Sequence, residues 1–261
     1  MKWLKNKKIK WLDENCISIN GVSFYIMKTL MDLQTIESTY QRFLLGKPRW
    51  MVEKYINLLG TITAKKIFEL GVLKGGSSVF FHELFNPQKL VAIEYKEKPV
   101  NALQEYIERK QCQRILKPYY GVDQADKEKM AAILKNEFPN KDIDIVIDDA
   151  SHMLDETRSS FNMIFPYVRP GGLFIIEDWS WSHAPHDIWQ KPNGKWSDKP
   201  ALTSLIFEII MSCPSTPDLI DEISIDKNNV FIRRGNGNIE SDNFDITKSY
   251  LTRGKEFISY L

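Results

Sequence analysis

The sequence predicts an α/β protein with a doubly wound, mainly parallel sheet of seven strands, preceded by a helical arm. From Lys66 onward, short apolar runs that end in acidic residues or glycine alternate with amphipathic stretches of helical spacing. This alternation is typical of a parallel sheet with helices on both faces. The last two apolar runs are separated only by the polar turn DKNN at 226–229, which predicts an antiparallel hairpin at one end of the sheet.

The five parallel strands are expected at near-continuous apolar runs, and the helices at the amphipathic stretches between and after them. Around this core we expect three regions: an N-terminal helical arm or lid at 1–60, a cofactor-binding catalytic domain at 61–236, and a C-terminal extension at 237–261 whose role the sequence leaves open. The expected strands are 66–71, 90–95, 114–121, 142–149 and 172–178, and the expected helices are 77–85, 99–110, 127–138, 157–168 and 201–212.

The charge balance excludes one class of partner. The chain has 35 Lys plus Arg against 34 Asp plus Glu, so it has no overall field that would hold nucleic acid or an anionic membrane. It contains no run of 18 apolar residues, and no apolar run follows its basic start. The three cysteines are far apart in the sequence. We therefore expect a cytoplasmic protein with free thiols that acts on a small molecule, and a homo-oligomer is left open.

A glycine-rich turn follows the first strand of the expected sheet and opens a helix. Such a turn lets backbone amides approach a ligand, and a carboxylate at the end of the next strand can accept hydrogen bonds from ribose hydroxyls. Leu73 stands where a dinucleotide-binding motif needs its second glycine, which disfavours a nicotinamide cofactor. The alternative is a tight turn without a ligand. The candidate cofactor residues here are Glu69, Gly71, Gly75, Gly76, Ser77 and Glu94.

Three further residues are candidates for contact with a nucleoside cofactor. Asp123 and Gln124 follow the third strand, where a side chain or a neighbouring amide can read an adenine. Asp148 ends the fourth strand, at the sheet edge where ligands of α/β proteins bind.

Carboxylates gather at the ends of the fourth and fifth strands, which we expect to be neighbours. Asp149, Glu177 and Asp178 are the candidate ligands of a divalent cation such as Mg²⁺, because clustered carboxylates repel each other unless a cation is bound. Glu177 and Asp178 can both be ligands only if the strand has ended at Glu177, since adjacent strand residues face opposite ways. The alternative is that Asp148 and Glu177 cap backbone amides or contact the cofactor, without a metal.

His152 lies three residues beyond Asp149 and is the candidate general base. A histidine side chain is largely neutral at physiological pH and can accept the proton of a hydroxyl. Trp179, Trp181 and Trp189 follow the fifth strand, where they could stack on a sugar or aromatic ring or serve as packing.

The motif series ELGVLKGGSS, VAIEY, VIDDASHMLDET and PGGLFIIEDW, over roughly residues 65 to 180, resembles the Mg²⁺-dependent sugar O-methyltransferases of macrolide biosynthesis and the related cephalosporin hydroxylase group. The resemblance implies a Rossmann-like class I methyltransferase fold with S-adenosylmethionine as cofactor. It also implies that Asp149, Glu177 and Asp178 hold Mg²⁺ and that His152 is the base. The expected reaction is O-methylation of a hydroxyl on a small molecule such as a natural-product sugar.

Three alternatives to this function stay open from the sequence. They are an N-methyltransferase of the same fold, a nicotinamide-dependent oxidoreductase, and a cofactor-binding protein without catalysis. The acceptor and the methylated position cannot be read from the motifs, because loops with no recognisable pattern would line the substrate pocket.

Overall fold

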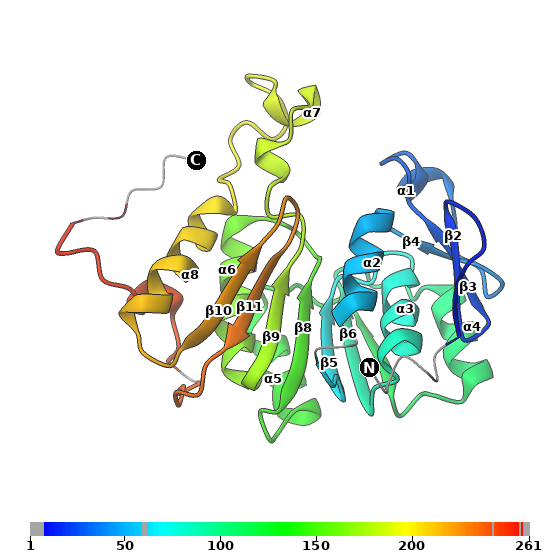
Figure 1. The fold of residues 1–261 in the computed structure, drawn as a ribbon, viewed down its shortest axis with the longest axis horizontal. Helices are drawn as coiled ribbons and strands as arrows, with labels where there is room; N and C mark the ends of the chain where they lie inside the picture. Colours follow the sequence, from blue (N-terminus) through cyan, green and yellow to red (C-terminus); the bar gives the residue numbers. More distant parts are fainter. Residues whose placement is uncertain (1–7, 59–61, 242, 256, 258–261) are drawn as a thin grey trace. The chain divides into compact units, whose positions relative to one another are not determined.

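The computed structural model describes residues 8–58, 62–241, 243–255 and 257. The chain divides into two compact units, Met1–Gly121 and Val122–Leu261. In Figure 1 the first unit runs from blue to green and the second from green to red. The first unit contributes three strands to the larger sheet and the second contributes four, so the seven predicted strands are confirmed.

The strands of the first unit are all parallel to one another. β5 (Lys66–Leu70) pairs with β6 (Lys89–Glu94), which pairs in turn with β7 (Leu116–Tyr120). Two crossover helices connect them, α3 (Gly76–Phe85) and α4 (Asn101–Lys110). Each strand lies within two residues of its predicted range at both ends, because a near-continuous apolar run is the mark of a strand covered on both faces.

The strands of the second unit form the mixed part of the sheet. β8 (Ile143–Asp148) is buried along its whole length and runs parallel to β9 (Val168–Ile176). β9 pairs antiparallel with β11 (Val230–Arg234), which forms the predicted hairpin with β10 (Ile220–Ile225). The prediction of a mainly parallel sheet that ends in an antiparallel hairpin is therefore confirmed.

The helices of the second unit follow the predicted amphipathic stretches with one difference. The predicted helix at 157–168 begins earlier and ends at Ile164, because a short 3-10 turn over Phe165–Tyr167 that contains Pro166 leads directly into β9. Among the residues that the structure describes, no helix is both long and apolar enough to cross a membrane. The helices are α5 (Lys127–Glu137), α6 (Leu154–Ile164), the single turn α7 (Asp187–Gln190) and α8 (Thr203–Ser215).

The prediction of an N-terminal helical arm was wrong over most of its length. Asn20 and Gly21 have φ angles of 51° and 89° and form a two-residue hairpin turn, so the chain on either side is extended. An Asn-Gly pair between alternating apolar residues is the strongest short-range hairpin signal, and it outweighs the helical spacing that we read there. Residues 1–7 of the predicted arm lie outside the described residues. The observed elements are β1 (Ile9–Trp11), β2 (Cys16–Ile19), β3 (Val22–Ile26), the single turn α1 (Asp32–Thr35), β4 (Phe43–Leu45) and the helix α2 (Arg49–Leu58), which was predicted.

The small N-terminal sheet is joined to the helices of the first unit by polar and steric contacts. At the hairpin turn, Asn20 Nδ2 donates to Glu83 Oε2 on α3 at 2.9 Å. Tyr106 on α4 donates to the other carboxylate oxygen of Glu83 at 2.7 Å, and Lys110 Nζ lies 2.9 Å from the same oxygen. These contacts make Glu83 the centre of a buried network that ties the hairpin to two helices.

The C-terminal stretch packs on α6 of the second unit. The Phe244 ring lies 5.9 Å from the Phe165 ring, and Ile246 is fully buried. The Ile246 amide donates to Asn162 Oδ1 at 2.9 Å. Residues around Ile246 therefore form part of the core of this unit, and the predicted boundary at 237 stays a prediction.

Candidate functional site

The loop after β5 is bent by residues in left-handed backbone conformations. Gly71, Leu73 and Gly75 have φ angles of 93°, 51° and 78°. The Gly71 amide donates to the Ile93 carbonyl of β6 at 2.9 Å, and α3 begins at Gly76 without a side-chain cap on its first turn. A tight loop that leads into a helix start presents backbone amides, which suits an anionic group such as a carboxylate.

Glu94, at the end of β6, holds this loop in place. Its Oε2 accepts hydrogen bonds from the Val72 and Leu73 amides at 3.1 and 2.8 Å, and its Oε1 accepts one from the Lys96 amide at 3.0 Å. Glu94 is buried. The carboxylate therefore fixes the loop conformation, including the positive φ of Leu73, and its predicted contact with a ribose remains a prediction.

The other predicted residues of this loop have different environments. Glu69 is fully buried in β5 and accepts a hydrogen bond of 2.5 Å from Ser78 Oγ, a residue that the sequence analysis did not single out. A Cβ on Gly76 would lie 1.8 Å from the Leu44 carbonyl oxygen of β4. Gly76 is therefore required for close packing in the first unit, whatever its role toward a cofactor, and Ser77 beside it is half-buried.

In the second unit, Gln124 and Asp148 form a buried polar network. Gln124 Nε2 lies 3.3 Å from both carboxylate oxygens of Asp148, and Ser160 Oγ donates to Asp148 Oδ2 at 2.8 Å. Burial raises the pKa of Asp148 to about 6, although the Ser160 hydroxyl and the nearby His152 act in the opposite direction. Gln124 Oε1 also accepts the Ser151 amide at 2.9 Å. This network supports the chain where it leaves β8.

Asp123 differs from its neighbour Gln124 because it is exposed. Its Oδ1 accepts the Ala125 amide at 2.8 Å, which closes a local turn after β7. The predicted contact of Asp123 with an adenine stays a prediction.

Asp149, His152 and Asp178 come together at the ends of β8 and β9. One ligand atom from each lies within 4.8 Å of the other two, and His152 Nε2 is 3.8 Å from Asp149 Oδ1. The two carboxylates fit a divalent cation that takes mainly oxygen ligands, because such an ion relieves the repulsion between them. The imidazole of His152 lies beside the two carboxylates. The structure thus brings together two of the three predicted metal ligands and the predicted base.

Glu177 is not a member of this group, although it precedes Asp178 directly. β9 ends at Ile176, and Asp178 has a φ of 51°, so the chain has left the strand before both acidic residues. This backbone turn removes the geometric objection raised from the sequence. Glu177 is 1% exposed, and its amide donates to the Asp148 carbonyl at 2.9 Å.

Two contacts that the sequence did not predict support this group. Trp181 Nε1 donates to the His152 carbonyl at 2.8 Å, and His152 has a φ of 57°. Asn228 Nδ2, from the turn between β10 and β11, donates to Asp178 Oδ1 at 2.9 Å. No local pattern pairs residues this far apart in sequence, although the strand order places that turn beside the end of β9.

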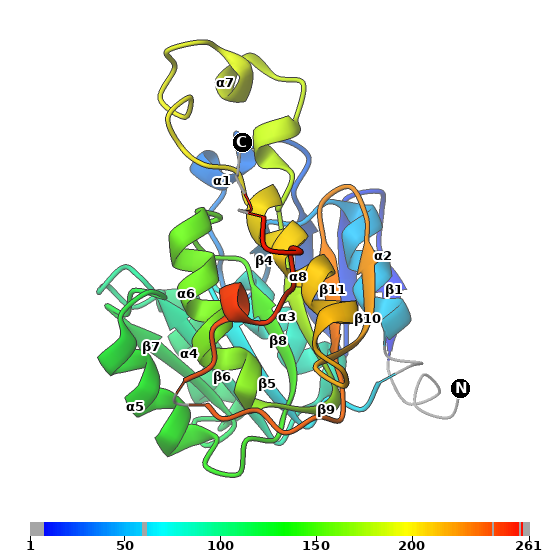
Figure 2. The same ribbon diagram turned by 90° about the vertical axis from the view of Figure 1, so that its left-hand side faces the viewer.

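Three tryptophans cluster in the segment between β9 and α8. The ring centroids of Trp181, Trp189 and Trp196 lie 5.4 to 5.9 Å apart. Figures 1 and 2 show this segment, which carries α7, rising beyond the strands of the second unit. Trp181 is buried, whereas Trp189 and Trp196 are half-buried and leave part of their rings accessible.

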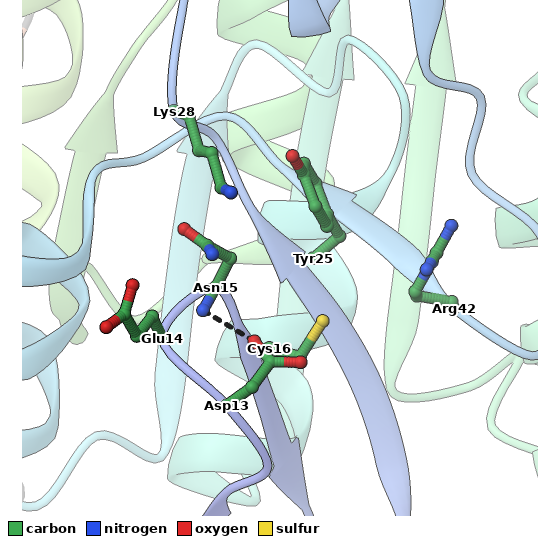
Figure 3. A pocket seen from close by; sticks show the side chains of 7 residues that line it. All are labelled: Asp13, Glu14, Asn15, Cys16, Tyr25, Lys28 and Arg42. Atoms are coloured by element: carbon green, nitrogen blue, oxygen red, sulfur yellow. Dashed lines mark hydrogen bonds between the residues drawn. The ribbon is translucent and has the colours of Figure 1, made fainter.

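A separate polar pocket of about 390 Å³ lies on the N-terminal sheet of the first unit. Figure 3 shows Tyr25 between the side chains of Lys28 and Arg42, with Asp13 accepting a hydrogen bond of 2.7 Å from the Asn15 amide. The pocket contains charges of both signs, and none of the predicted site residues lines it. Its lining residues are Asp13, Glu14, Asn15, Cys16, Tyr25, Lys28 and Arg42.

Residues 68–179 match a family described as a methyltransferase domain. In sequence, the chain is 63% identical over 35 residues to the demethylmacrocin O-methyltransferase of Streptomyces fradiae. The matched segment is 13% of this chain and 9% of that protein. The chain is 50% identical over 56 residues to the mycinamicin VI 2''-O-methyltransferase of Micromonospora griseorubida. This segment is 22% of this chain and 13% of that protein.

Solved structures show the same fold. The MycE methyltransferase of the mycinamycin biosynthetic pathway, solved with Mg, SAH and mycinamycin VI, matches with a TM-score of 0.53 and 24% identity over 73% of this chain and 50% of that chain. A putative caffeoyl-CoA O-methyltransferase from Staphylococcus aureus matches with a TM-score of 0.53 and 16% identity over 72% and 84% of the two chains. The chain thus spans about half the length of MycE.

Residues 68–179 thus match a methyltransferase domain, and the chain has the fold of the solved methyltransferases. Its short matched segments are similar in sequence to the two O-methyltransferases named above. The nicotinamide-dependent oxidoreductase, one of the alternatives from the sequence, has no support from these findings.

Proposed function

We propose that this protein transfers a methyl group from S-adenosylmethionine to a hydroxyl oxygen of a sugar on a natural product, with a divalent cation such as Mg²⁺ at the site. The observation that carries the proposal is the grouping of Asp149, His152 and Asp178 at the ends of β8 and β9. The names of the related proteins support an O-methyl transfer, and a macrolide is bound in the MycE structure.

The first unit would bind the methionine and ribose parts of the cofactor. The bent loop from Gly71 to Gly75 leads into the uncapped start of α3 at Gly76, whose first amides would suit the methionine carboxylate. Glu94 would accept a hydrogen bond from a ribose hydroxyl while it continues to hold the loop. In the second unit, the turn at Asp123 would read the adenine.

The second unit would hold the cation and remove the proton. Asp149 and Asp178 would supply carboxylate oxygens, and Glu177 stays a predicted third ligand. When bound, Mg²⁺ would lower the pKa of the substrate hydroxyl and fix its orientation. His152 would accept the hydroxyl proton as the oxygen attacks the methyl carbon. A carbon–oxygen bond forms, the carbon–sulfur bond breaks with its electron pair left on sulfur, and neutral S-adenosylhomocysteine departs.

The test is methyl transfer to defined acceptors. The protein is incubated with S-adenosylmethionine, Mg²⁺ and either mycinamicin VI or demethylmacrocin, with the sugar-free macrolide as the control acceptor, and the product is located by NMR. We expect an O-methylated sugar and loss of turnover with EDTA or His152→Ala. An N-methylated product would show that the protein is an N-methyltransferase and not an O-methyltransferase. Tight binding of the cofactor without turnover of any acceptor on a wide panel would favour a cofactor-binding protein without catalysis.

A further inference from the structure

The turn between β10 and β11, residues 226–229, forms hydrogen bonds with the chain just after β9. Asn228 Nδ2 donates to Asp178 Oδ1 at 2.9 Å, and the Trp179 amide donates to the Asn228 carbonyl at 3.2 Å. Trp179 Nε1 donates to the Asp226 carbonyl at 2.9 Å, and Ser180 Oγ donates to the Lys227 carbonyl. One turn therefore holds three consecutive residues, of which Asp178 is the first.

The side chain of Asp226 closes the turn. Asp226 Oδ1 accepts the amides of Asn228 and Asn229 at 2.8 and 2.7 Å, and the Asp226 amide donates to the Asn229 carbonyl at 2.9 Å. Aspartate side chains stabilise turns in this way. Asn228 is therefore presented to Asp178 from a preformed loop, and little conformational entropy is lost when it binds the carboxylate.

The chemistry of the donor matters for a cation site. A lysine or arginine at this position would neutralise Asp178 and compete with a metal ion, whereas the amide of Asn228 is neutral and leaves the full negative charge in place. It also occupies one lone-pair direction of Oδ1, which orients the carboxylate. Asp178 also has an uncommon backbone φ of 51°.

We propose that Asn228 is a positioning residue for the metal site and that the β10–β11 turn orients the carboxylate of Asp178 toward the cation. This inference rests on the proposed function, because it requires that Asp178 binds a divalent cation. Partners that orient metal ligands in this way commonly change metal affinity by 10- to 100-fold when they are removed.

The experiment measures Mg²⁺ binding by calorimetry, without S-adenosylmethionine, for the unaltered chain and five variants. Asn228→Ala removes the donor, and Asn228→Ser keeps turn propensity but shortens the side chain. Asn136→Ala, at an exposed position on α5, is the matched control. Asp178→Asn and the double variant with Asn228→Ala form a double-mutant cycle. Melting temperatures in EDTA confirm that each variant is folded.

We expect both Asn228 variants to bind Mg²⁺ roughly tenfold more weakly, Asn136→Ala to bind normally, and Asn228→Ala to have no further effect once Asp178→Asn is present. Normal Mg²⁺ affinity in the folded Asn228 variants, together with loss of affinity in Asp178→Asn, would overturn this inference and keep the proposed metal site. A wild-type chain that binds S-adenosylhomocysteine but no Mg²⁺ would overturn both this inference and the proposed metal site.

Discussion

Trp181 donates its indole N–H to the carbonyl oxygen of His152 at 2.8 Å, which links the tryptophan-rich segment to the residue that we propose as the base. His152 has a φ of 57°, a conformation uncommon outside glycine, and the hydrogen bond from Trp181 is a contact that fixes it. The position of the segment between β9 and α8 is therefore coupled to the orientation of the imidazole.

Replacing Trp181 with Phe should lower kcat by about fivefold and leave KM for S-adenosylmethionine unchanged, since one net hydrogen bond contributes about 1 kcal/mol. Steady-state kinetics of methyl transfer checks this. The control is Trp189→Phe, which lies in the same ring cluster without the bond to His152. Equal kcat values for the two variants would show that the contact with His152 does not matter for turnover.

The carboxylate of Glu94 should be needed for cofactor binding as well as for loop shape. We expect Glu94→Ala to weaken S-adenosylhomocysteine binding at least tenfold, because three backbone amides lose their acceptor and the loop that presents the helix start is released. Calorimetry measures the affinity. Glu97→Ala, an exposed neighbour just beyond β6, serves as the control, and similar affinities in both variants would contradict the assignment.

A methyl group at position 76 should disrupt the first unit. The added Cβ of Gly76→Ala would lie 1.8 Å from the Leu44 carbonyl oxygen, which belongs to the backbone and cannot rotate away. We expect a loss of roughly 2 to 4 kcal/mol in unfolding free energy, a range typical of overpacking at its severe end. In Gly46→Ala, the closest atom is the end of the flexible Leu33 side chain at 3.1 Å, so the loss should be smaller. Urea unfolding of both variants measures the two losses of unfolding free energy and shows which is larger.

The Glu83 network should make stability depend on pH on the acid side. Burial raises the pKa of Glu83, but the hydrogen bonds from Tyr106, Asn20 and Lys110 outweigh it and hold the pKa below its ordinary value of 4.5. A carboxylate with a lowered pKa stabilises the fold above 4.5, and this contribution disappears as the pH falls through the folded-state pKa.

Glu83→Gln should therefore cost about 2 kcal/mol at neutral pH and progressively less as the solution is acidified below 4.5. Unfolding free energies of wild type and variant over this range give the difference directly. A difference that stays constant with pH would show that the charge of Glu83 is not what stabilises the hairpin contact.

The sequence predicted the strands well because strands covered on both faces are almost purely apolar, as the fully buried β8 illustrates. Between residues 8 and 45 the sequence-based prediction failed because helical spacing and strand alternation overlap in short apolar runs. Only Asn20-Gly21 carried the decisive information, through its backbone conformation. In this segment the turn chemistry therefore outweighs the apolar periodicity.

For the candidate site, the sequence could indicate which residues share a sheet edge but not what orients them. Asp149, His152 and Asp178 follow from the order of strands in an α/β sheet. The contacts of Trp181 with His152 and of Asn228 with Asp178 join residues 29 and 50 positions apart, and their partners depend on side-chain directions set by tertiary packing. Likewise, the buried role of Gln124 beneath Asp148 depends on Ser160, which no motif includes.

The most direct test of the central claim is calorimetric titration of the purified chain with S-adenosylhomocysteine and, separately, with NADH, each in Mg²⁺ and in EDTA. The account predicts micromolar binding of S-adenosylhomocysteine, no binding of NADH, and an Mg²⁺ signal that Asp149→Asn abolishes. Binding of NADH without S-adenosylhomocysteine would contradict the methyltransferase function, and S-adenosylhomocysteine binding without any Mg²⁺ signal would remove the metal from the proposed reaction.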